Sequence, residues 1–201
     1  MTSLEMLKEF KVGIDKIDSE SYPEIYKEQI FMFINKAIDE LVNEGRKVFE
    51  QDQTITDNLK SLIPARPVVL IPVKAIGFEE YVFDLANIDY LFYIRASITT
   101  KVNTKLGKAG VTVTQHDDIE TILDDPYNLP KPYKVPVTFA RSSITAYATP
   151  DFSVENMHLT YVKKPLSVSV GTNCDIDSQL HYIIVDRAVS LAAISLGITK
   201  Q

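Results

Sequence analysis

Three adjacent residues, His116, Asp117 and Asp118, form the group in this sequence best suited to binding a metal ion. Imidazole nitrogens and carboxylate oxygens are common ligands of divalent metals. Consecutive side chains point in different directions on a regular backbone, however, so one ion rarely takes all three. We therefore interpret Asp117 as the cap of a short helix over residues 119–123 and the other two as solvated, with a metal site as the alternative.

Acid–base and nucleophilic chemistry have two further candidates. Asp124 and Asp125 could pair their carboxylates, but adjacent acids before Pro126 are typical of a turn that ends a helix. Cys174 is next to Asp175, whose negative charge disfavours a thiolate nucleophile. The remaining candidate residues are isolated or lie in expected loops: Asp84, Asp89, His158 and His181.

Sequence motifs that bind phosphate or activate a nucleophile are absent. The seven glycines form no GxxxxGK[ST], GxGxxG or GxSxG pattern, and the histidines form no HExxH pair. A cysteine pair for a zinc knuckle is also missing, because the sequence has a single cysteine. We expect no catalytic, cofactor-binding or metal-binding residues, and a structural rather than an enzymatic role.

Charge and composition narrow the class of protein further. The chain has 201 residues, 27 acidic against 21 basic, with a net charge of −6. Binding along the DNA backbone requires clustered basic residues, whereas the longest basic run here is Lys163–Lys164. The N-terminus lacks the features of a secretory signal, and no window of 18 apolar residues occurs. We expect a soluble protein made in the cytoplasm, without a disulfide and without a membrane partner.

A long amphipathic helix is expected over residues 24–50. Ser21 can accept a hydrogen bond from an early backbone N–H, Glu24 can return it, and Pro23 suits the first turn. Apolar residues then recur every three or four positions, with a second row beside them on the same face. They are Tyr26, Ile30, Ile34, Ala37, Leu41, Gly45 and Val48, flanked by Ile25, Ile38, Val42 and Phe49. This stripe fits packing within one core, and its length also fits packing between subunits.

The middle of the sequence is typical of β structure. It follows a short helical turn over residues 56–63, capped by Thr56 and ended by Pro64. Gly107 and Gly110 are expected to flank the turn of a hairpin, and the four prolines of residues 126–136 predict an extended surface arm or loop rather than a central strand. Alternating β-branched and aromatic residues predict strands at residues 68–73, 79–85, 90–102, 111–115, 136–140, 143–149, 157–162 and 166–170.

A second helix is expected near the end of the chain, capped by Asp175 or Asp177 and ended by Gly197. Since helices occupy both ends, we expect them to pack together with the β-rich segment between them, which is an α+β fold. The expected organisation is an N-terminal arm at 1–21 and a single domain at 22–201. That domain divides into a helical part at 22–65, a β-rich insertion at 66–172 with the proline-rich arm 126–136, and a C-terminal helix at 173–201.

This order of elements resembles the head–tail connector and tail ring proteins of short-tailed bacteriophages, crAss-like phages in particular. The resemblance begins at about Tyr22 with the long helix IYKEQIFMFINKAIDELVNEG and continues through PVVLIPV, YLFYIRASIT and the arm HDDIETILDDPYNLPKPYKVP. Its most specific part is the C-terminal run YVKKP…CDID…HxxIVDxAV. The first 21 residues lie outside the resemblance and are expected to form an arm that becomes ordered on assembly.

The resemblance implies a virion structural protein of the phage neck or tail. Such proteins form closed rings, commonly of twelve copies, that extend the DNA channel of the portal and provide a platform for the next ring or the tail. The implied partners are copies of the chain itself, the portal and the neighbouring ring proteins, with genomic DNA only as passing cargo. The family has no catalytic or cofactor residues.

Two alternatives to the ring stay open at this stage. One is another virion component, such as a cargo protein or a fibre-attachment protein. The other is a small metal-dependent hydrolase whose site includes His116, Asp117 and Asp118. The ring reading alone predicts large closed oligomers, and the hydrolase reading predicts activity that depends on a divalent metal.

Overall fold

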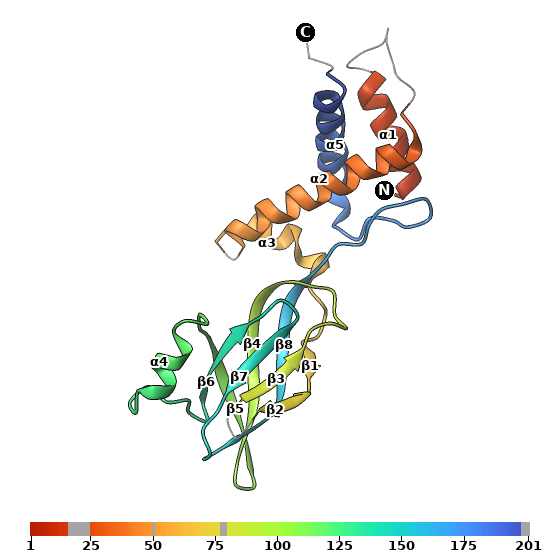
Figure 1. Cartoon of the computed structure of the whole chain (residues 1–201). Helices are drawn as coiled ribbons and strands as arrows, with labels where there is room; N and C mark the ends of the chain where they lie inside the picture. Colours follow the sequence, from red (N-terminus) through yellow and green to blue (C-terminus); the bar gives the residue numbers. More distant parts are fainter. Residues whose placement is uncertain (16–24, 50, 77–79, 198–201) are drawn as a thin grey trace. The chain divides into compact units, whose positions relative to one another are not determined.

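The computed structural model describes residues 1–15, 25–49, 51–76 and 80–197 (Figure 1). The chain divides into two compact units, a helical unit of residues 1–62 and 164–201 and a β unit of residues 63–163. Helices near both ends of the chain and a β-rich segment between them confirm the expected α+β class. The chain leaves the helical unit after Leu62 and returns to it at Lys164.

The helical unit consists of α1 (Ser3–Asp15), α2 (Lys27–Val48), α3 (Gln53–Asn58) and α5 (His181–Ser195), with two short 3₁₀ helices, η1 (Lys60–Leu62) and η2 (Ser178–Leu180). Helix α5 packs against both α1 and α2, so the terminal helices do pack together as expected. Helix α5 is apolar on most of its surface, which suits a helix covered from more than one side.

Helix α2 carries the expected apolar stripe but starts later than predicted. It begins at Lys27, and the Gln29 side chain accepts a hydrogen bond from the Tyr26 N–H at 3.2 Å. The expected cap of Ser21, Pro23 and Glu24 lies outside the described residues. Burial follows the three- and four-residue spacing. The buried residues of the stripe are Ile30, Ile34, Ala37, Ile38, Val42 and Gly45.

Residues 3–15 form helix α1, within the segment 1–21 that the sequence analysis assigns to an N-terminal arm. Met6, Phe10 and Ile14 recur every four residues on α1 and are completely buried. The ring of Phe10 stacks on that of Phe33 from α2, with centroids 6.4 Å apart. At Gly13 the backbone of α1 approaches α5 so closely that an added Cβ would lie 2.8 Å from a methyl group of Val189. The start of the chain is therefore part of the core of the helical unit.

The segment after Lys164, where the chain returns to the helical unit, is held by hydrogen bonds to the Asn35 side chain rather than by pairing in a sheet. The sequence predicts a strand at residues 166–170, but only an isolated bridge between Ser169 and Thr172 forms there. The Asn35 side chain of α2 accepts a hydrogen bond from the Val168 N–H at 2.7 Å and donates one to the Val168 carbonyl at 3.0 Å. This paired contact replaces the strand neighbours that the backbone of Val168 would otherwise need.

We expect Asn35→Ala to lower the free energy of unfolding of the helical unit by roughly 1–3 kcal/mol, because the N–H and C=O of buried Val168 lose their partner. Asn35→Asp should also destabilise, since a carboxylate still accepts from the N–H but cannot donate to the carbonyl. Urea denaturation followed by circular dichroism measures the change. The exposed neighbour Lys36→Ala is the control, and equal stabilities of the two alanine variants would contradict the prediction.

The β unit is one eight-stranded sheet in the order β1-β8-β4-β5-β6-β7-β3-β2. All neighbouring strands are antiparallel except β5 and β6, which are parallel. The strands are β1 (Val68–Leu70), β2 (Lys74–Ile76), β3 (Glu80–Asp84), β4 (Tyr90–Val102), β5 (Lys105–Val113), β6 (Lys134–Phe139), β7 (Ser143–Tyr147) and β8 (Ser153–Lys163).

This sheet must curve back on itself. Strands β1 and β2 are its two edges, yet only residues 71–73 connect them. Seven strand spacings in a flat sheet would separate the edges by roughly 34 Å, whereas the connection from Leu70 to Lys74 spans at most about 14 Å. The sheet therefore wraps around its own apolar face as an incomplete barrel.

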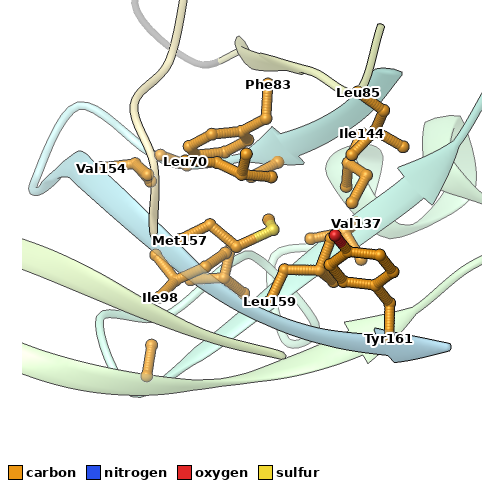
Figure 2. Close-up of a cluster of buried hydrophobic side chains, with 14 of the residues drawn as sticks. Leu70, Phe83, Leu85, Ile98, Val137, Ile144, Val154, Met157, Leu159 and Tyr161 are labelled. Atoms are coloured by element: carbon orange, nitrogen blue, oxygen red, sulfur yellow. The ribbon is translucent and has the colours of Figure 1, made fainter. Parts of the chain in front are cut away.

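The barrel interior is filled by buried apolar side chains from opposite sides of the curved sheet (Figure 2). Phe83, Ile98, Ile144, Met157 and Leu159 are completely buried. Alternating positions of β8 contribute Val154, Met157, Leu159 and Tyr161, with an irregular register near Thr99 and Thr100 of β4. Packing of this kind makes the β unit a core of its own.

The hairpin between β4 and β5 has a tighter turn than the sequence predicts. Val102 pairs with Lys105, so the loop is Asn103 and Thr104 alone. Asn103 has a φ of 52°, a conformation that asparagine adopts more readily than most residues. The expectation that Gly107 and Gly110 flank the turn is wrong, because both lie within β5.

The proline-rich segment also differs from the expectation. Residues 126–133 are loop, but β6 begins at Lys134 and includes Pro136, and β6 lies between β5 and β7. The expected exclusion of this proline from a central strand is therefore wrong. The pairing of β6 with β7 covers only Val137 to Phe139, so the missing N–H of Pro136 falls just beyond the end of that ladder.

Three helix boundaries complete the comparison. Helix α3 begins at Gln53, not at Thr56, and the Asp52 carboxylate accepts from the Thr54 N–H at 2.8 Å. Helix α4 (Ile119–Asp124) follows Asp118 rather than the expected cap Asp117. At the last helix, Asp177 accepts from the Gln179 N–H at the start of η2, and Gly197 with a φ of 70° follows the end of α5, as predicted.

Candidate assembly surfaces

The candidate metal ligands do not converge on a site. His116, Asp117 and Asp118 are all exposed, and the His116 Nε2 lies 2.9 Å from the carbonyl oxygen of Phe139. Among the residues that the structure describes, no group of three histidine, cysteine or acidic side chains could hold a metal ion. The alternative of a metal-dependent hydrolase therefore gains no geometric support.

The carboxylate pair at 124–125 is a turn, as the sequence indicates. Asp125 follows α4, and its carboxylate accepts hydrogen bonds from the Tyr127 N–H at 2.9 Å and from the Asn128 amide at 2.6 Å. These two bonds, the backbone one first, lower the pKa of Asp125 below its ordinary value. Its charge therefore stabilises the turn.

Acid should weaken this turn. Because the pKa of Asp125 is lowered in the folded chain, its contribution is complete above the ordinary value of 3.8 and is lost as the pH falls through the lower folded value. We expect the amide proton of Tyr127 to titrate in NMR spectra with a midpoint below 3.8. Asp125→Asn keeps an acceptor oxygen and should abolish the titration. A midpoint at or above the ordinary value would contradict this account.

Cys174 and the two other histidines are also held in structural settings. Burial, and more weakly the charge of Asp175, raises the pKa of the Cys174 thiol, which disfavours the thiolate. The buried ring of His181 lies 3.0 Å from the Ile176 carbonyl through Nε2 and 2.9 Å from the N-terminal amine through Nδ1. His158 lies on the outer side of β8, in an open hollow that Arg95 and Lys108 also line.

An open groove of about 370 Å³ lies beside α4 in the β unit, and we call it the α4 groove. It lies where the ends of β5 and β6 meet the proline-rich loop. Tyr127 and Tyr133 on its wall are 87% and 66% exposed, so large apolar surfaces face solvent there. The residues that line it are Thr112, Thr114, Ile122, Tyr127, Asn128, Leu129, Pro130, Lys131, Tyr133, Lys134 and Pro136.

An acidic segment, residues 117–125, precedes the loop that lines this groove. The segment of residues 117–125 contains five carboxylates, of which Asp118 and Asp125 lie one helical turn before and after groove-lining Ile122. Two lysines, Lys131 and Lys134, line the groove itself. The sequence analysis identified the proline-rich segment but not the groove. The groove forms only when β6 pairs with β5 and brings the loop beside the strands.

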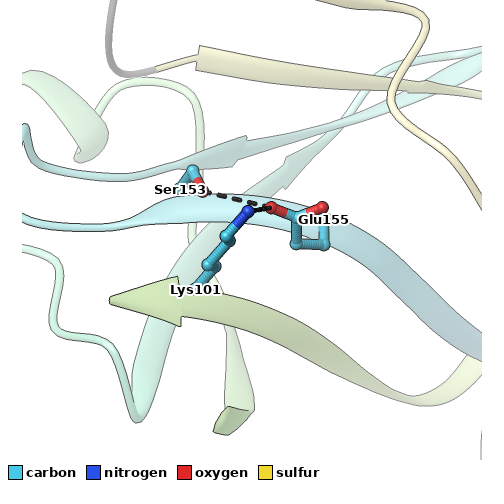
Figure 3. Close-up of polar contacts among 3 residues, drawn as sticks. All are labelled: Lys101, Ser153 and Glu155. Atoms are coloured by element: carbon cyan, nitrogen blue, oxygen red, sulfur yellow. Dashed lines mark hydrogen bonds and ion pairs between the residues drawn. The ribbon is translucent and has the colours of Figure 1, made fainter. Parts of the chain in front are cut away.

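The opposite end of β5 carries basic residues. We call residues 101–108 the β4–β5 tip. Leu106 is 68% exposed, and it lies on the same face as its cross-strand partner Lys101 and as Lys108. Lys101 forms an ion pair with Glu155 at 3.8 Å, next to Ser153 (Figure 3). Among the described residues, Lys105 and Lys108 form no ion pair.

The helical unit also exposes apolar side chains. Tyr182, Ile183 and Ile194 of α5 are more than half exposed. Ile183 lines a groove of about 330 Å³ between α5 and α2, where Arg187 binds Glu44 at 2.8 Å. In the β unit, Val69, Ile71 and Val73 are exposed along and after the edge strand β1. These exposed apolar groups are candidate contacts with other proteins.

The comparisons with known proteins agree with an assembly role. Among curated proteins, none matches this chain. In the described part of the chain, no helix is long and apolar enough to cross a lipid bilayer. The family described as phage tail ring protein 3/4 matches residues 1–201, which includes the first 21 residues that the sequence resemblance leaves out. The chain therefore belongs to the tail ring protein 3/4 family of crAss-like phages and is a structural component of the virion.

Proposed function

We propose that copies of this chain form a closed homo-oligomeric ring of twelve in the connector between phage head and tail. The ring extends the DNA channel of the portal and provides a platform for the next ring or for the tail. Its partners are further copies of the chain, the portal and the neighbouring ring proteins. The subunits are made in the cytoplasm of the bacterial host. Membership of the tail ring family is the observation that carries this proposal.

The distribution of exposed apolar residues supports assembly through both units. A ring contact is heterologous, so each subunit needs two different faces that fit each other. Apolar side chains are exposed on α5 in the helical unit, and on the β1 edge, the β4–β5 tip and the α4 groove in the β unit. A subunit that contacts neighbours in its own ring and in adjacent rings needs several separate surfaces, and these positions supply them.

The charge of the chain supports DNA as a transient occupant of the channel. The net charge of −6 repels a polyanion on average. A channel wall of that character lets DNA pass without holding it, because tight binding depends on many lysine and arginine contacts to phosphate.

Electron microscopy of purified particles tests the proposal directly. The expected result is a ring of this chain, with twelvefold symmetry, on the axis between portal and tail. Particles in which the chain is absent, or is present only as a filling of the capsid, would overturn the proposal. A ring of another symmetry would overturn the copy number alone.

A further inference from the structure

The outer face of the β unit has an open hollow of about 350 Å³ where β4 lies beside β5 and β8, and we call it the β4 hollow. Ile98 of β4 and Leu159 of β8 lie between its lining residues and are completely buried in the barrel core. Alternation along each strand therefore directs the lining side chains away from that core. Three cross-strand pairs line the hollow: Arg95 with Thr160, Ser97 with His158, and Thr99 with Lys108.

The β4 hollow is a local positive site. Arg95 and Lys108 are exposed, and within the described part of the chain neither forms an ion pair. The described residues that line the hollow include no carboxylate. Two positions after Thr99 on β4, Lys101 pairs with Glu155 at 3.8 Å (Figure 3), so the charge of that carboxylate is already compensated. An anion therefore meets uncompensated positive charge here, although the whole chain has a net charge of −6.

The donors of the hollow suit phosphate oxygens. The guanidinium of Arg95 offers a planar fork of N–H groups, and the ammonium of Lys108 offers a compact charge. The serine and threonine hydroxyls and the imidazole of His158 add uncharged hydrogen-bond donors. Proteins contact the phosphates and sugars of DNA with this mixture of cationic and hydroxyl side chains.

The spacing of the two cations favours an extended polyanion over a single small anion. Arg95 and Thr99 are four residues apart on β4, which separates Arg95 from the strand partner of Lys108 by roughly 13 Å. One carboxylate or one free phosphate bound by Arg95 leaves Lys108 without a partner. Each strand of DNA carries a charge about every 3.4 Å of helix axis, so a single stretch of backbone can contact both cations.

We propose that the β4 hollow binds the phosphate backbone of duplex DNA, with Arg95 and Lys108 on different phosphates and with His158 and the hydroxyls between them. In the ring, the outer face of β4, β5 and β8 then faces the DNA channel. Two cations in each copy hold DNA weakly, which suits DNA that must pass through. This inference rests on the proposed function and identifies the face of the β unit that meets the DNA.

Titration of the full-length chain with a short DNA duplex, followed through the imidazole NMR signals, tests the site. The chain has three histidines, and His158→Gln identifies the signals of His158. We expect the duplex to shift these signals and to leave those of the buried His181 in place. Because each copy neutralises about two phosphates, the affinity should fall roughly tenfold between 50 and 200 mM salt.

A matched pair of double variants separates a site from general attraction. Arg95→Gln with Lys108→Gln should abolish the shift of the His158 signals. Lys105→Gln with Lys131→Gln removes the same charge from exposed positions of the same unit outside the hollow, and it should preserve the shift. Circular dichroism confirms that both variants are folded. Equal loss in the two variants would overturn the inference. It would also be overturned if inorganic phosphate or polyglutamate shifted the His158 signals at concentrations as low as the duplex does.

DNA cleavage in particles tests the orientation of the hollow in the ring. In a Cys174→Ser background, Thr99→Cys carries a tethered iron chelate that cleaves nearby DNA during ejection, and Lys131→Cys carries the same chelate as the control. We expect cleavage from position 99 and none from position 131. Rings that give no cleavage from position 99, or equal cleavage from both positions, would overturn the inference and leave the ring function standing. Absence of this chain's ring from wild-type particles would instead overturn the proposed function.

Discussion

Phe10→Ala is expected to lower the free energy of unfolding of the helical unit by about 3–5 kcal/mol, the usual cost of removing a fully buried aromatic ring. Phe10 has no exposed surface, and its ring stacks on Phe33 of α2. The cavity would lie where α1 joins the rest of the helical unit, so protection from hydrogen exchange should fall first in α1. Mass-spectrometric hydrogen exchange resolves this change by segment.

Leu4→Ala is the matched control for Phe10. Leu4 lies on the same helix but is more than half exposed, so its truncation should change stability by less than about 0.5 kcal/mol. The prediction fails if Phe10→Ala leaves the exchange of α1 unchanged. That result would mean that residues 3–15 do not pack stably on α2 and α5 in the isolated chain, as expected of an arm that becomes ordered only on assembly.

Phe83→Ala should destabilise the β unit by a similar amount, about 3–5 kcal/mol. Phe83 lies on β3 and is completely buried in the barrel core (Figure 2). Its loss should lower protection from hydrogen exchange in the strands that share this core. These strands include β4, which contributes Ile98, and β8, which contributes Met157. Urea denaturation followed by tyrosine fluorescence suits the measurement, since the chain has ten tyrosines and no tryptophan.

The control for Phe83 is Ile71→Ala in the connection between β1 and β2. Ile71 is an equally apolar residue of the same unit, but it is largely exposed, so its truncation should have little effect on stability. If both variants unfold at the same urea concentration, Phe83 does not stabilise the core of the β unit as proposed.

The sequence predicts long, strongly patterned elements well and local exceptions poorly. The strand at residues 90–102 agrees with β4 at both ends, because eight of its thirteen residues are β-branched or aromatic and strongly favour a strand. Helix α1 was missed because its stripe of Met6, Phe10 and Ile14 is short and its burial depends on α2 and on α5, which lies far along the chain. Tertiary packing, rather than propensity, decides such a segment.

Errors in the β-rich region have similar causes. Residues 166–170 have strand propensity, but the Asn35 amide takes the hydrogen bonds of Val168, and propensity cannot reveal that competitor. Pro136 is tolerated in β6 because its missing donor falls beyond the ladder with β7, a matter of register that a composition rule does not contain.

The candidate surfaces were only partly visible in the sequence. The proline-rich loop and the acidic run around α4 could be read directly, and so could the lysines after β4. That a groove forms beside α4 follows from the parallel pairing of β5 with β6. Parallel pairing of strands separated by a helix and a loop leaves no local signature.

In the sequence, the β unit lies between the two parts of the helical unit. This order determines which unit can fold first during synthesis. The barrel occupies a continuous stretch and can close as soon as β8 emerges to pair with β1 and β4. The apolar faces of α1 and α2 are made first, yet they must wait for α5 before they are covered. Each nascent chain therefore exposes the apolar faces of these helices while more than a hundred residues are translated, a state in which chains are prone to aggregation.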